Sequence, residues 1–193
     1  MDSKKIMMVL SMFLIIGSSY LLFGNYNNFT TGQGGITGMP IATASVEVTA
    51  ISQISMPVNS VSFGATEPGA TKDTSKDSPP PFKIQNDGTV SVNVTIARDS
   101  SSAPLFSGTG GGDNTASFQF AANETVAEPG SFDTTTSLMS WTNVPGTTPI
   151  TFLKILDFAT SGDEAEVELR ISVPIDEPAG VKSEALMFIA SQA

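Results

Sequence analysis

The sequence predicts an all-β protein, an antiparallel β-sandwich of about eight or nine strands that follows an N-terminal hydrophobic helix. Three observations support this fold class. Several short segments alternate apolar and polar residues, which is the pattern of half-buried strands. Turn residues, with 17 Gly and 12 Pro in the chain, separate these segments, and none has the periodicity of an amphipathic helix. The 24 Ser and 21 Thr also suit strands and turns more than helices.

An apolar segment at the N-terminus predicts export. Residues 1–23 contain an uncharged run of 18 residues directly after Lys4 and Lys5, and basic residues before such a run send the following chain outward. The small residues at 17–19 are typical of a cleaved signal peptide, whereas the whole run is also close to the length of an uncleaved membrane anchor. Both interpretations place the rest of the chain outside the cell, with membrane contact through residues 1–23 only.

Composition divides the remaining chain into two parts. Residues 24–43 are rich in Gly, Asn and Thr and predict a linker with little to bury. Residues 44–193 are enough for one domain with its own core and too few for two. This domain is the predicted sandwich, and we expect its topology to be Ig-like or jelly-roll-like.

Charge and composition exclude several classes of function. Nine basic residues against 19 acidic ones give a net charge of −10, so no basic surface is available to bind nucleic acid. The absence of Cys and His removes thiolate nucleophiles, disulfides, Cys/His zinc sites and imidazole bases. We therefore expect that the protein is not an enzyme and has no catalytic residue, no cofactor and no metal site.

The first half of the domain contains four strand segments. Residues 45–50 and 61–63 come first, and the charged, proline-rich residues 70–81 predict an exposed loop after them. Residues 82–84 and 89–96 are expected to form a hairpin, because an Asn-Asp-Gly turn lies between them. The last of these segments places four apolar side chains on one face, namely Val90, Val92, Val94 and Ile96.

The second half contains four more strand segments after a long Ser- and Gly-rich loop. Residues 118–120 predict a short strand, and residues 150–158 are apolar on both faces, which favours a central strand over a short helix. Residues 165–173 alternate clearly, and residues 182–190 form the last strand. In the third segment the predicted inward residues are Val167, Leu169, Ile171 and Val173, and the predicted outward residues are Glu166, Glu168 and Arg170.

Three segments in this order resemble a known group of proteins. Residues 61–69 (VSFGATEPG), 81–96 (PFKIQNDGTVSVNVTI) and 169–190 (LRISVPIDEPAGVKSEALMFIA) follow the export segment. This arrangement resembles the Ig-like β-sandwich domains of prokaryotic, especially archaeal, cell-surface proteins. Within that group it is most similar to the subunits of archaeal bundling pili, which are related to the TasA-type fibres of bacterial biofilm matrices.

The resemblance implies polymerisation by donor-strand complementation, in which an N-terminal strand of one subunit completes the sheet of the next. Residues 44–54 (ASVEVTAISQI) fit the donor, because they alternate and are tethered by the linker. The side chains expected to insert are Val46, Val48, Ala50 and Ile51. The same pattern also fits the first strand of the chain's own domain, so both interpretations remain open.

Three N-x-[ST] sequons are candidate glycan acceptors on an exported protein. They begin at Asn28, Asn93 and Asn123. Loop carboxylates are a further candidate feature, as oxygen ligands for calcium. They lack the spacing of a calcium loop, so solvated turn acids are the better interpretation. These residues are Asp113, Asp163, Glu164, Asp176 and Glu177.

These observations predict a structural subunit of an extracellular pilus-like filament or biofilm matrix fibre. Its main partner would be itself, in a homopolymer, with attached glycans as a further possibility. The alternative is a monomeric, membrane-anchored cell-surface module that binds a glycan or a cell-wall ligand. That alternative predicts exposed aromatic side chains at one loop end, for which Phe106, Phe132 and Trp141 are the candidates.

Overall fold

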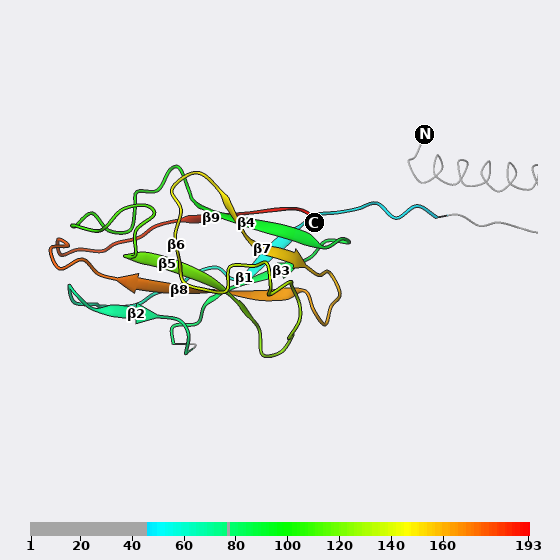
Figure 1. The fold of residues 1–193 in the computed structure, drawn as a ribbon, viewed down its shortest axis with the longest axis horizontal. Coiled ribbons are helices and arrows are strands. Elements are labelled where there is room, and N and C mark those ends of the chain that lie inside the picture. Colours follow the sequence, from blue (N-terminus) through cyan, green and yellow to red (C-terminus); the bar gives the residue numbers. More distant parts are fainter. Residues whose placement is uncertain (1–45, 77) are drawn as a thin grey trace, which may run out of the picture. The chain divides into compact units, whose positions relative to one another are not determined.

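A computed structural model describes residues 46–76 and 78–193. The predictions for the export segment, its helix, the linker, the sequon at Asn28 and the first two residues of the donor segment lie outside this part. The described residues are all-β, with nine strands in two antiparallel sheets and no helix (Figure 1). The strands are β1 (Ile54–Val58), β2 (Thr71–Asp73), β3 (Phe82–Asn86), β4 (Val92–Arg98), β5 (Phe118–Glu124), β6 (Thr142–Asn143), β7 (Ile150–Leu156), β8 (Glu164–Ser172) and β9 (Leu186–Gln192).

The two sheets are unequal in size and pack face to face. The six-stranded sheet has the order β1-β3-β8-β5-β6, with β2 also paired to β8, and the three-stranded sheet has the order β7-β4-β9. Edge-to-face aromatic contacts join the layers: Phe120 meets Phe152 with ring centroids 5.5 Å apart, and Phe82 meets Phe188 at 6.1 Å. Because the smaller sheet has half as many strands, part of the larger sheet's inner face is left for other segments to cover.

The inward faces of the two clearest segments are confirmed. Val92, Val94 and Ile96 of β4 are fully buried, as is Val167 of β8. The strand prediction for residues 150–158 is also confirmed, because β7 occupies most of this segment. The position of β7 differs from the prediction, since β7 is an edge strand and not a central one.

The predicted hairpin around the Asn-Asp-Gly turn is wrong. β3 and β4 flank this turn, but they belong to different sheets, so the chain crosses from one layer to the other here. Asn86 holds the crossing: its side-chain nitrogen donates to the carbonyls of Val90, Leu156 and Asp157 at 2.9–3.1 Å. A local turn signal specifies the reversal of the chain but not the sheet that the next strand joins.

Three other local predictions are wrong. Residues 61–63 form no strand, because no neighbouring strand pairs with them in the described structure. The predicted loop at residues 70–81 contains β2 and the fully buried Thr74. Glu168, expected in solvent, is buried because Thr74 and Asn123 both donate hydrogen bonds to its carboxylate.

Candidate functional site

Several of the strands at sheet edges carry features that block further pairing. β1 contains Pro57, which has no N–H to donate, and β2 and β6 are only three and two residues long. β7 contains Lys154 beside Ile155, whose φ of 55° and the register shift opposite it interrupt a regular ladder. Proline, charge, shortness and bulges are the devices that protect sheet edges from other chains.

β9 has none of these features. Its seven residues, LMFIASQ, contain no proline and no charge, and within the described structure it pairs with β4 alone. Met187 and Ile189 on one face are 37% and 46% exposed. On the other face Phe188 packs against the core and is still only partly buried. A long, apolar and open edge of this kind is a site for pairing with a further strand.

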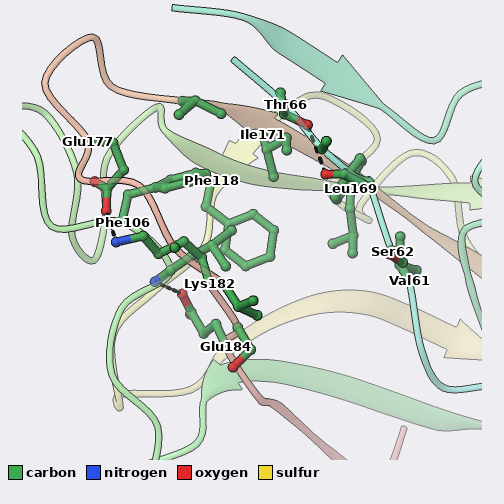
Figure 2. A pocket seen from close by; sticks show the side chains of 18 of the residues that line it. Val61, Ser62, Thr66, Phe106, Phe118, Leu169, Ile171, Glu177, Lys182 and Glu184 are labelled. Atoms are coloured by element: carbon green, nitrogen blue, oxygen red, sulfur yellow. Dashed lines mark hydrogen bonds and ion pairs between the residues drawn. The ribbon is translucent and has the colours of Figure 1, made fainter. Parts of the chain in front are cut away.

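A hollow of about 790 Å³ lies where β9 begins. We call it the groove; one wall is formed by residues 59–66 and Pro68, and the other by residues 177–184 and Leu186, in the chain that leads into β9. Figure 2 shows Val61, Ser62 and Thr66 on one side of the groove and Glu177, Lys182 and Glu184 on the opposite side. The core forms its floor, through Phe82, Phe106, Phe118, Leu169 and Ile171.

The groove is where the hydrophobic core is least covered. Twelve apolar residues pack against the core while remaining partly exposed, and half of them line the groove. These six are Val61, Phe63, Phe82, Leu105, Val173 and Leu186. An additional strand laid in the groove would remove this surface from water, which stabilises by about 25 cal/mol per Å² of apolar area.

Both walls of the groove also carry free backbone amides. No amide of residues 60–66 or 179–184 donates a hydrogen bond to another backbone group within residues 46–76 and 78–193. Residues 59–68 and 177–185 belong to neither sheet, although the first segment follows β1 and the second leads into β9. The groove therefore presents the two requirements for strand addition, an apolar surface and unpaired backbone groups.

Two carboxylates in the groove differ in their electrostatics. Glu177 is 2.5 Å from the Lys182 ammonium and accepts hydrogen bonds from the Ser107 and Gly108 amides, and this lowers its pKa to about 2. Glu184 has no cation at hydrogen-bond distance, and burial raises its pKa to about 7. Its Oε2 accepts a hydrogen bond from the Leu105 amide at 2.6 Å, while its Oε1 is buried and has no hydrogen-bond partner.

The candidate donor side chains lie outside both sheets. Val46 and Val48 are 88% and 76% exposed, Ala50 is exposed, and Ile51 is 47% exposed. The segment touches its own domain at Thr89, whose hydroxyl accepts from the Ile51 amide and donates to the Thr49 carbonyl. Ile54, the last residue of the predicted donor segment, already pairs with Asn86 in β1.

Residues 47–54 of the donor segment and the groove are at opposite ends of the unit formed by residues 47–193. Phe82 at the start of β3 lines the groove, whereas Asn86 at the end of β3 lies beside the turn that contains Thr89. Figure 1 shows the segment at residues 47–53 leaving this unit beside the C-terminus, and the loops around residues 106–112 and 175–180 at the other end. The segment therefore points away from the chain's own groove.

The other predicted site residues are spread over the domain. Asn123 is exposed on β5, and Asn93 on β4 is half-buried, with its Oδ1 accepting a hydrogen bond from the Ile155 amide at 3.2 Å. Among the loop acids, Asp113 pairs with Arg98 at 2.8 Å and Asp176 accepts from Thr109. Within residues 46–76 and 78–193, no three or more metal-ligating acidic side chains form a group that could hold an ion.

The expected cluster of exposed loop aromatics is not present. Phe106 and Phe132 are each only 6% exposed and belong to the core. Trp141 is half-buried, and the Arg170 guanidinium stacks on its ring, 4.0 Å from the ring centroid. The sequence positions of these aromatics indicated loops correctly but carried no information on which way their side chains turn.

No family model matches the chain, and no curated protein matches it either. In the described part of the chain, no helix is long and apolar enough to span a membrane.

Neither the groove nor Glu184 was predicted from the sequence. Residues 61–63 had the apolar pattern of a strand, but in the described structure they pair with no strand and line the groove. Glu184 lies in the segment 182–190, which was predicted as a strand that is apolar on both faces. Its burial depends on Leu105, 79 residues away in the sequence, so no local signal could have found it.

Proposed function

We propose that the chain is a structural subunit of an extracellular pilus-like filament or matrix fibre. Subunits polymerise head to tail, because the donor segment of one copy inserts into the groove of the next and pairs with its backbone. The observation that carries this proposal is the unprotected edge of β9 beside a groove with free amides and an uncovered core.

The separation of donor and groove supports an open polymer over a closed dimer. A donor that leaves one end of a domain and an acceptor at the other end make a head-to-tail contact, and repeating that contact extends the chain of subunits. The exposed valines at 46 and 48 supply apolar side chains at alternate positions, as an inserted strand requires.

The rest of the prediction belongs to the same proposal. Export through residues 1–23 brings the domain to the cell surface, and Asn93 and Asn123 are acceptors for glycans on the outside of the filament. Pairing between strands distant in the sequence, such as β4 with β9, supports an Ig-like or jelly-roll-like topology.

The test is electron microscopy of the full chain, purified from the cell surface and medium of an expressing host. We expect filaments from the native sequence and none from the double variant Val46→Asp, Val48→Asp, because two charges cannot enter an apolar groove. Both valines are exposed in the single subunit, so the variant should retain its melting temperature.

The control is Val126→Asp, which adds an aspartate at a fully exposed valine. Val126 lies outside the donor segment and does not line the groove. This variant should assemble like the native chain. Filaments from the double variant, or single subunits from the native chain at all concentrations, would contradict the proposal. The second result would favour the monomeric binding module.

A further inference from the structure

We propose, resting on the filament function above, that Glu184 is the residue by which the groove recognises the inserted strand. Its carboxyl group lines the groove and loses its remaining water when the strand is inserted, which favours the protonated form. Insertion of the donor segment is therefore coupled to the uptake of one proton, and the filament assembles more readily as the pH falls.

The geometry assigns the two oxygens of Glu184 different roles. Oε2 is already occupied by the Leu105 amide at 2.6 Å, which fixes the carboxyl group at the groove wall. Oε1 is buried and has no hydrogen-bond partner in the described structure. A buried polar atom without a partner is costly, about 1–3 kcal/mol, so the position of Oε1 already disfavours the charged carboxylate in the single subunit.

The charged groups around Glu184 do not provide a competing partner. The Arg98 guanidinium is engaged with Asp113 at 2.8 Å, and the Lys182 ammonium is engaged with Glu177 at 2.5 Å. Asp113 raises the pKa of Glu184 and Arg98 lowers it, while burial is the largest cause and raises it. The carboxyl group is thus the one acidic group lining the groove whose charge is not compensated by a direct ion pair.

An inserted strand removes the remaining water from this carboxyl group. Ionised Glu184 would then be enclosed in an apolar contact without a counter-ion, so occupancy of the groove raises its pKa further above 7. A group that binds its proton more tightly in the assembled state makes assembly favourable at low pH. Above the pKa of the open groove, one proton must be taken up for each insertion, so affinity falls about tenfold per pH unit.

The experiment measures the critical concentration for filament formation of the full chain by sedimentation between pH 6 and pH 8.5. We compare the native chain with Glu184→Gln and with Glu67→Gln. The glutamine at 184 is neutral at every pH and keeps an acceptor for the Leu105 amide. Glu67 is exposed and does not line the groove, so its replacement removes a charge without altering the site.

We expect the critical concentration of the native chain and of Glu67→Gln to rise up to about tenfold per pH unit above pH 7. That of Glu184→Gln should stay constant. A native profile that is flat, or one that Glu184→Gln reproduces, would overturn the role of Glu184 while the filaments themselves leave the proposed function standing. Absence of filaments at every pH in all three chains would overturn the proposed function and this inference with it.

Discussion

The two flanks of the space between the sheets are built from the same kinds of residue but reach different degrees of burial. On the β7 flank, Phe120, Phe152 and Leu153 are at most 1% exposed. On the β9 flank, Leu105 and Leu186 pack against the same core and stay partly exposed. The first flank is closed by strands of this chain, whereas the second stays open at the groove.

The difference shows that the open flank is not a defect of composition. Its residues are as apolar as those of the closed flank, and its edge strand lacks the protective features that β1 and β7 carry. A domain that functions as a monomer would be more stable if this flank were covered. We infer that the covering strand comes from another copy of the chain.

The largest expected effect is on the closed flank. Phe152→Ala should reduce the free energy of unfolding of the single subunit by about 3–5 kcal/mol, because it leaves a cavity in a tightly packed site. Leu105→Ala on the open flank should cost less, about 1–2 kcal/mol, because part of that side chain is already in water.

Both substitutions are made in the double variant Val46→Asp, Val48→Asp, which is not expected to assemble. Denaturant unfolding then measures the loss of stability of the single subunit in each case. The comparison would fail if Leu105→Ala were as destabilising as Phe152→Ala. That result would mean that the groove is closed in the single subunit.

A smaller effect is expected at the rim of the groove, where Glu177 holds the loop that contains Ser107 and Gly108. Its pKa of about 2 lies below the ordinary value of 4.5, so its stabilising contribution is complete above about pH 4.5 and is lost as the pH falls towards 2. Hydrogen exchange of the Ser107 and Gly108 amides should therefore accelerate below pH 4.5, once the intrinsic pH dependence of exchange is subtracted.

Asp133 provides the matched control for this measurement. Its pKa is also about 2, because the hydroxyls of Thr135 and Thr136 and the Thr135 amide donate to it, but it is remote from the groove in the sequence and forms no wall of it. Asp133→Asn should leave the exchange of the rim amides unchanged, whereas Glu177→Gln should accelerate it at neutral pH. Equal protection of the rim in Glu177→Gln and the native chain would contradict the role of Glu177.

The sequence allowed the core strands to be predicted because their pattern is local. The apolar residues of β4 and β8 alternate regularly in the sequence, and this pattern predicts that one face of each strand packs against the core. The pairing of strands was not predictable in the same way: the Asn-Asp-Gly turn indicated a reversal and gave no information on the sheet change that Asn86 fixes. Glu168 and Thr74 are buried against each other although they are 94 residues apart in the sequence, so no local pattern could predict their contact.

The donor segment and its groove were predictable to different degrees. The alternation at residues 44–54 is visible in the sequence. Whether this segment pairs within its own domain depends on which sheet edge is open, and the sequence does not show that. The groove depends on how segments far apart in the sequence come together, since residues 59–66, 105–106 and 177–184 all line it, and no local pattern specifies that arrangement.

The most direct measurement of the central claim uses two variants with complementary defects. Val46→Asp, Val48→Asp keeps the groove and loses the donor, whereas Ser62→Trp places a bulky ring at an exposed groove wall and keeps the donor. Each should be a single subunit alone, and their equimolar mixture should give a 1:1 dimer that grows no further, measured by light scattering after size exclusion. A mixture that contains only single subunits would contradict the pairing of donor and groove.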